Sequence, residues 1–131
     1  MDRVALAKHR IDNHPAGGTL TLSGELGTPN HGYFVGGAGP LLAFQSEEML
    51  RENWKAVESY VSAMISSGHQ HLGWWTDPET EKVYLDCSTW HPDMFQADQH
   101  AMRRGEIAFY DVEGDRDIKT GSTGVGEPPA A

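Results

Sequence analysis

Residues 71–87 read HLGWWTDPETEKVYLDC, in which two strand-like runs flank a short polar segment. The runs 71–76 and 82–87 are rich in aromatic and β-branched residues, which favour strands. Between the runs Asp77 precedes Pro78, an order that is typical of tight turns. The stretch therefore predicts a β-hairpin, around which the rest of the fold is expected to pack.

A long helix is predicted before this hairpin, over about residues 46–67. Ser46 is placed to cap the first turn, and Gly68 is placed to end the last one. Apolar residues recur at spacings of four and three, which puts them on one face of a helix; they are Leu50, Trp54, Val57, Val61 and Met64.

Short strands and a second helix complete the pattern. Strands are expected at residues 19–23, 33–35, 41–44 and 107–112, and a helix at residues 94–104. Residues 1–10 fit either a short helix or an arm. Hairpins predominate, which predicts an α+β fold: a small, mainly antiparallel sheet with one long and one short helix packed on one face. Residues 1–120 are expected to form one domain, and the Gly- and Pro-rich residues 121–131 a flexible tail.

Composition and charge exclude several classes of function. The 131-residue chain carries a formal net charge of −9, and from Gln70 onward it has twelve acidic residues against five Lys or Arg. Nucleic-acid binding needs clustered Lys and Arg, so we expect no nucleic-acid partner. The chain has no apolar run of about 20 residues, so we expect no membrane partner. The single cysteine, Cys87, excludes an internal disulfide and favours a cytoplasmic location.

Aromatic residues of the hairpin form the first candidate site. Trp74 and Trp75 are adjacent on a strand and must face opposite sides of the sheet. If one of them packs on the long helix, the other is exposed, unless Met94, Phe95 and Met102 of the second helix cover it. An exposed tryptophan is typical of a binding hot spot or a dimer contact. The predicted binding residues are Trp74, Trp75, Tyr84 and Trp90.

Histidines near the hairpin form the alternative candidate site. His69 and His71 are two apart and can share one face of a strand, while Asp86 and His91 lie on and after the returning arm. Two histidines with a carboxylate or with Cys87 would suit zinc or iron. The spacing lacks the helical pattern of the zinc hydrolases, so solvent-facing or hydrogen-bonded imidazoles are the other interpretation.

Three further patterns have simpler structural interpretations. The glycine-rich residues 32–39 lack the lysine of a phosphate loop and lead into a strand, which indicates a hairpin loop. The alternating carboxylates from Asp111 to Asp117 lack the spacing of a calcium loop and indicate a solvated turn. Cys87 and His91 resemble a thiol and its base, but strand alternation predicts that Cys87 is buried as a small hydrophobic residue.

Part of the chain between Gly73 and Thr120 resembles small uncharacterised proteins of actinobacteriophages and their hosts. The resemblance rests on WWTDPET at residues 74–80, VYLD at residues 83–86 and IAFYD at residues 107–111. Those proteins often have a glycine where this chain has Glu81. The resemblance implies a hairpin–helix–strand unit and an origin, and it implies no activity.

Together these patterns predict a small non-enzymatic accessory protein of a phage or an actinobacterium. It is expected to bind a protein partner or to form a homo-oligomer, without a cofactor, in the cytoplasm (the host cytoplasm if it is phage-encoded). The alternative is a metal-binding protein or metal-dependent enzyme that uses the cluster of His69, His71, Asp86 and His91 to hold zinc or iron.

Overall fold

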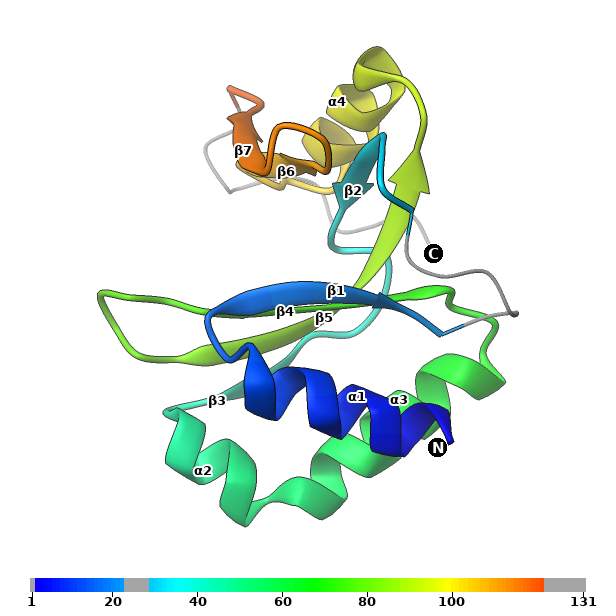
Figure 1. Ribbon diagram of the computed structural model, residues 1–131. Coiled ribbons are helices and arrows are strands. Elements are labelled where there is room, and N and C mark those ends of the chain that lie inside the picture. The colour runs from blue at the N-terminus through cyan, green and yellow to red at the C-terminus, as the bar shows by residue number, and fades with distance from the viewer. Residues whose placement is uncertain (1, 23–28, 122–131) are drawn as a thin grey trace.

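The computed structural model describes residues 2–22 and 29–121, which form four helices and seven strands (Figure 1). Every pairing among these strands is antiparallel, so the predicted α+β class with a mainly antiparallel sheet is confirmed. The elements are α1 (Arg3–Asn13), β1 (Gly17–Thr21), β2 (Tyr33–Val35), β3 (Leu42–Phe44), α2 (Glu47–Glu52), α3 (Trp54–Ser66), β4 (His71–Thr76), β5 (Val83–His91), α4 (Met94–Arg103), β6 (Ala108–Asp111) and β7 (Arg116–Lys119).

Strand β5 is the longest strand and connects two parts of the molecule. Its first half pairs with β4 on one edge and β3 on the other, and β4 pairs with β1. Its last three residues pair with β2, which continues through β6 to β7. We call β1, β3, β4 and the first half of β5, with α1–α3, the first lobe. The second lobe consists of the end of β5 with β2, β6, β7 and α4 (Figure 1).

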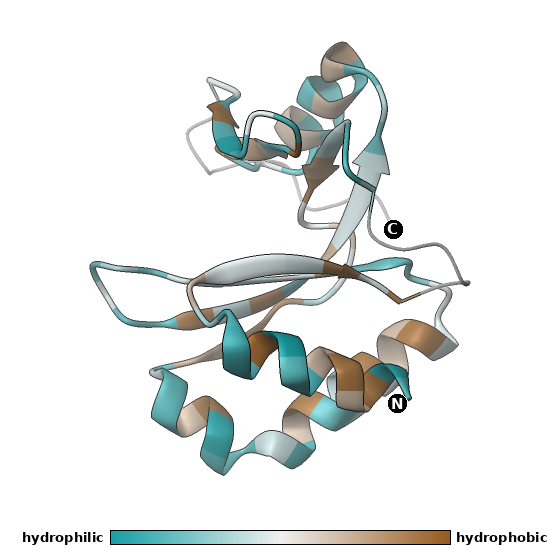
Figure 2. Cartoon of the chain, in the orientation of Figure 1, coloured by the Kyte–Doolittle hydropathy of each residue, from teal (hydrophilic) through white to brown (hydrophobic). Residues whose placement is uncertain are grey.

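The core of the first lobe lies between its sheet and helices α1–α3, which cover one face (Figure 1). Leu50, Val57, Val61 and Met64 of the predicted helical stripe are buried there, and Trp54 packs against the cluster. Hydrophobic and hydrophilic segments alternate along α1 and α3, as expected for helices with one buried side (Figure 2). The opposite face of this sheet, which we call the open face, has no helix on it in Figure 1.

The predicted long helix is two helices, α2 and α3, separated at Asn53. Asn53 has φ −112° and ψ 37°, and its side-chain amide donates a hydrogen bond to the Met49 carbonyl oxygen at 2.8 Å. Asparagine side chains compete in this way for backbone groups, which is why they favour helix ends. Of the residues predicted as a short helix or an arm, those from Arg3 onward form helix α1, whose first turn is capped by the Asp2 side chain.

The second lobe has a separate, smaller core of Val35, Ala97, Ala101 and Phe109. The two alanines face inward from α4, which begins and ends within one residue of its predicted bounds. Strand β7 was not predicted, because Ile118 is the single apolar residue among four and the other three are exposed. Of the predicted tail, residues 122–131 lie outside the described residues.

Among the described residues, no helix has both the length and the apolar character that crossing a membrane requires.

Candidate functional site

Trp74 belongs to the core and not to a surface, which corrects its predicted binding role. It pairs with Leu85 across the hairpin, is 5% exposed, and its indole N–H donates to the His14 carbonyl oxygen at 2.8 Å. Gly18 of β1 lies opposite Trp74, and a Cβ there would come within 2.5 Å of the indole ring. Because Gly18 has no Cβ, β1 can pass directly against the indole ring of Trp74.

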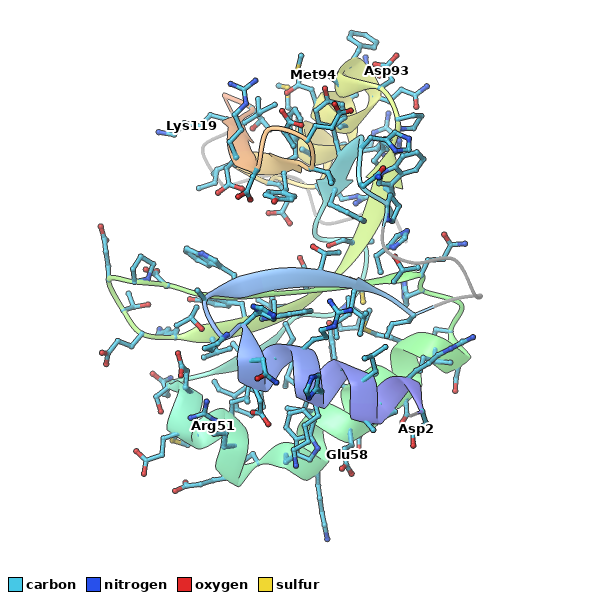
Figure 3. All side chains as sticks on the ribbon, viewed as in Figure 1. Asp2, Arg51, Glu58, Asp93, Met94 and Lys119 are labelled. Atoms are coloured by element: carbon cyan, nitrogen blue, oxygen red, sulfur yellow. The ribbon has the colours of Figure 1, made fainter. Side chains whose placement is uncertain are left out.

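Trp75 lies on the open face of the sheet, with half of its surface exposed. Its ring stacks on the Tyr84 ring of β5, with centroids 6.0 Å apart and planes inclined by 19°. The side chains that were expected to compete for this place do not cover it, because Met94, Phe95 and Met102 are themselves exposed. Met94 lies at the outer end of the second lobe (Figure 3). The hairpin therefore presents one aromatic pair to solvent.

Small residues flank this aromatic pair on the neighbouring strands. Gly17 of β1 pairs with Trp75, and Ala43 of β3 pairs with Tyr84. A Cβ on Gly17 would lie 3.5 Å from Trp75 Cδ1, so the glycine leaves that side of the indole uncovered by a β1 side chain. We call these four residues, Gly17, Trp75, Tyr84 and Ala43, the aromatic surface.

The turn next to the aromatic surface is acidic. Asp77, Glu79 and Glu81 lie in it with one cation, Lys82. The Asp77 carboxylate accepts the backbone N–H groups of Glu79 and Thr80, and the hydrogen bond from Glu79 is the main cause that lowers the pKa of Asp77. Glu79 and Glu81 are exposed. The turn therefore carries net negative charge one pair of residues beyond Trp75 and Tyr84.

Trp90 lies in the second lobe and not with Trp75. Its indole N–H donates to the His31 carbonyl oxygen at 2.7 Å, and the His31 ring meets it edge-on. Trp90 lies six positions after Tyr84 on β5, which is about 20 Å of extended chain. Of the four predicted binding residues, the structure therefore brings together only Trp75 and Tyr84 on a surface.

The four predicted metal ligands make separate contacts. His71 is 6% exposed. Its Nδ1 lies 3.0 Å from Thr21 Oγ1, and its ring meets the Phe34 ring edge-on. His69 lies against Gly39, and Asp86 accepts backbone N–H groups, as described below. His91 lies 2.7 Å from Thr89 Oγ1 and stacks on His100. In the part of the chain that the structure describes, no three His, Cys, Asp or Glu side chains are placed to hold a metal ion.

Cys87 is buried, as strand alternation predicts. Its Sγ lies 3.7 Å from the Tyr60 hydroxyl, and both Sγ and His69 Nε2 approach the place where a Cβ of Gly39 would lie. Burial is the main cause that raises the pKa of the Cys87 thiol, which keeps the thiol protonated at neutral pH. His91 is not its neighbour, so the predicted alternative of a thiol and its base does not form between these two residues.

A second polar group of residues, missed by the sequence analysis, joins the two lobes. Between β2 and β3 the chain leaves its regular pairing with β5, and only the Ala38 N–H is seen to donate to a β5 carbonyl oxygen there, that of Cys87 at 3.0 Å, among the described residues. The Asp86 carboxylate accepts the N–H groups of Gly37 at 2.7 Å and Cys87 at 2.8 Å. The Arg104 guanidinium donates to the carbonyl oxygens of Val35 at 3.1 Å and Gly36 at 3.0 Å. Two side chains thus satisfy four backbone groups, and we call this group the joint.

Glu106 lies over the joint without a hydrogen bond to its carboxylate among the described residues. Its Oε1 lies 2.6 Å from the place of a Cβ on Gly37. Burial and, second, the charge of Asp86 raise the pKa of Glu106, while burial also raises the pKa of Asp86. Arg104 and Glu106 carry no sequence signal for this role, because the contact depends on how α4 packs against β2.

The molecule is hollowed beside α1, away from both groups. A shallow depression of about 260 Å³ is lined by Lys8, Asp12, Arg51 and Trp54. Lys8 Nζ lies 5.2 Å from the Trp54 ring centroid, and Arg51 forms an ion pair with Asp12 at 3.6 Å. These side chains satisfy one another across the depression.

No known protein family, curated protein or solved structure matches the chain. The function is therefore inferred from the residues of the two groups themselves.

Proposed function

We propose that the protein is a non-enzymatic binding protein that holds a protein partner on the aromatic surface. The observation that supports this most is Trp75, half exposed and stacked on Tyr84 on the open face of the sheet. Tryptophan and tyrosine are enriched among the residues that contribute most to binding energy at interfaces. Aromatic side chains, which rotate about only two side-chain bonds, also lose little conformational entropy when a partner covers them.

A different protein fits this surface better than a second copy. Each copy carries a formal net charge of −9, so association of two copies brings like charges together. The acidic turn beside the aromatic surface adds a local repulsion to that overall one. An accessory role in the cytoplasm of an actinobacterium, or in that of a phage host, belongs to the same proposal and rests on the resemblance described above.

Selection from a displayed library of random peptides tests this proposal, because it finds binding sequences even when the natural partner is unidentified. The wild type, Trp75→Ala and Phe95→Ala would be used as bait, after circular dichroism shows that all three are folded. Phe95 is the matched control, since it is an exposed aromatic residue of the second lobe. We expect the wild type and Phe95→Ala to enrich the same peptides and Trp75→Ala to enrich none of them.

Equal enrichment by Trp75→Ala would contradict the proposal, because binding would then occur elsewhere. Sedimentation velocity on the same proteins tests whether a second copy, and not a different protein, occupies the aromatic surface. A wild-type dimer that Trp75→Ala converts to a monomer would show that a second copy occupies the aromatic surface.

A further inference from the structure

We infer that the partner segment is basic, and that one of its arginine side chains lies on the free side of the Trp75 ring. The inference rests on the proposed function and names the chemistry of its partner. Two observations support it: the side of the indole that carries no β1 side chain, and the exposed carboxylates of the neighbouring turn.

The indole of Trp75 is placed to receive a cation. Tyr84 occupies one side of the ring, and Gly17 provides no side chain on the strand at the other side. Tryptophan is the best aromatic acceptor for a cation, and the planar guanidinium of arginine also stacks on the ring. The molecule already makes such a contact elsewhere, where Lys8 lies over Trp54. Within the described residues, no cation of the chain itself is found over Trp75.

Carboxylates of the turn provide charge complementarity for a basic segment. The ion pairs found among the described residues use Asp12, Glu47 and Asp111. Glu79 and Glu81 are exposed and belong to none of these pairs. A segment with an arginine over Trp75 would therefore place its neighbouring basic side chains within reach of the two exposed carboxylates Glu79 and Glu81. The net charge of −9 would add long-range attraction for such a segment.

Nuclear magnetic resonance of the indole N–H groups tests the inference directly. The four tryptophans give four signals, which single Trp→Phe variants would assign. Trp74 and Trp90 donate to internal carbonyl oxygens and act as references. The probes are oligo-arginine, oligo-lysine and oligo-glutamate peptides of equal length. We expect oligo-arginine to shift the Trp75 signal at the lowest concentration, oligo-lysine to shift it more weakly, and oligo-glutamate to leave it in place.

Two double variants with the same change of charge separate local from overall attraction. Glu79→Gln with Glu81→Gln removes the turn carboxylates, and Glu48→Gln with Glu52→Gln removes two exposed carboxylates of α2. The first is expected to weaken oligo-arginine binding by about fivefold, and the second to change it much less. An equal loss in both would overturn the inference, since it would show attraction to the acidic chain as a whole.

The failure of this inference can be distinguished from the failure of the proposed function. If the library selection depends on Trp75 but enriches peptides without basic residues, the aromatic surface is a binding surface and the inference that its partner is basic is wrong. If oligo-arginine shifts all four indole signals alike, or none, the arginine contact at Trp75 is wrong. If no peptide depends on Trp75, the proposed function itself is wrong.

Discussion

The Asp86 carboxylate accepts the backbone N–H groups of Gly37 and Cys87. Hydrogen bonds to an ionised acceptor are stronger than neutral ones, and here the bond from Gly37 fixes the loop between β2 and β3 to β5. Burial raises the pKa of Asp86, and these two N–H groups oppose the rise. The residue therefore serves the connection between the lobes, although its place in the sequence resembled that of a metal ligand.

Asp86→Ala is predicted to destabilise the protein by about 1–3 kcal/mol, because the N–H groups of Gly37 and Cys87 lose their acceptor in a partly buried place. The free energy of unfolding in urea measures the loss. Glu106→Gln is the matched control, since it neutralises the neighbouring carboxyl, which accepts no hydrogen bond among the described residues. It is expected to leave stability unchanged or slightly raised at neutral pH. An equal loss in both variants would mean that charge, and not the two hydrogen bonds, decides stability there.

Single residues also show how far the sequence could predict the candidate site. Strand alternation predicted that Trp74 and Trp75 face opposite sides, and the structure confirms this. It could not predict which ring is buried, because that depends on the side of the sheet that α1–α3 cover and on Gly18 beneath Trp74. Gly17 and Gly18 look alike in the sequence, but one lies beside the exposed ring and the other against the buried ring.

At the scale of elements, β5 determines the arrangement of the histidines. The hairpin was predicted to end near Cys87, but β5 continues to His91 and enters the second lobe. In the antiparallel register His71 lies opposite Ser88 and Asp86 lies opposite Gly73. His91, three residues beyond Ser88, pairs instead with Tyr33 of β2. The four predicted metal ligands therefore lie apart in the described structure, because nearness in sequence does not give nearness across two lobes.

The contact between β5 and α4 is predicted to weaken in acid. His91 stacks on His100 with ring centroids 4.4 Å apart. Burial, followed by the charges of His100 and Arg104, lowers the pKa of His91 to about 4, and burial with Arg104 and Arg103 lowers that of His100. An unfolded histidine takes up a proton near pH 6.5, so unfolding binds protons between about pH 6.5 and about pH 4. The free energy of unfolding should fall as the pH falls through this window.

Comparison with His91→Gln isolates this contribution. The free energy of unfolding would be measured for both proteins at about pH 7.5 and about pH 4.5, on either side of most of the change. The raised pKa values of Asp86 and Glu106 have the opposite effect, because they make the folded protein more stable as the pH falls. Both proteins contain these two residues, so the comparison removes their effect. The wild type is expected to lose more stability on acidification than His91→Gln. Equal losses would show that the stacked pair does not contribute.

At the scale of the whole molecule, the fold class followed from hairpin signals and helical periodicity, but the division into two lobes did not. Each lobe has its own buried cluster, and among the described strands only β5 pairs with strands of both lobes. The sequence contains no marker of this division, because it arises where residues between β2 and β3 leave the edge of β5. The same geometry leaves the hairpin end of the open face free, where Trp75 and Tyr84 lie.

On the proposed function, the Trp75 ring is available to a partner and is not needed by the fold. The free energy of unfolding of Trp75→Ala, measured beside that of Trp74→Ala, tests this. Trp74→Ala should cost about 3–5 kcal/mol, because it empties the core and removes the hydrogen bond to His14. Trp75→Ala should cost about 1 kcal/mol or less, the contribution of one cross-strand pair. If Trp75→Ala is as destabilising as Trp74→Ala, both rings belong to the core and the aromatic surface is not a binding surface.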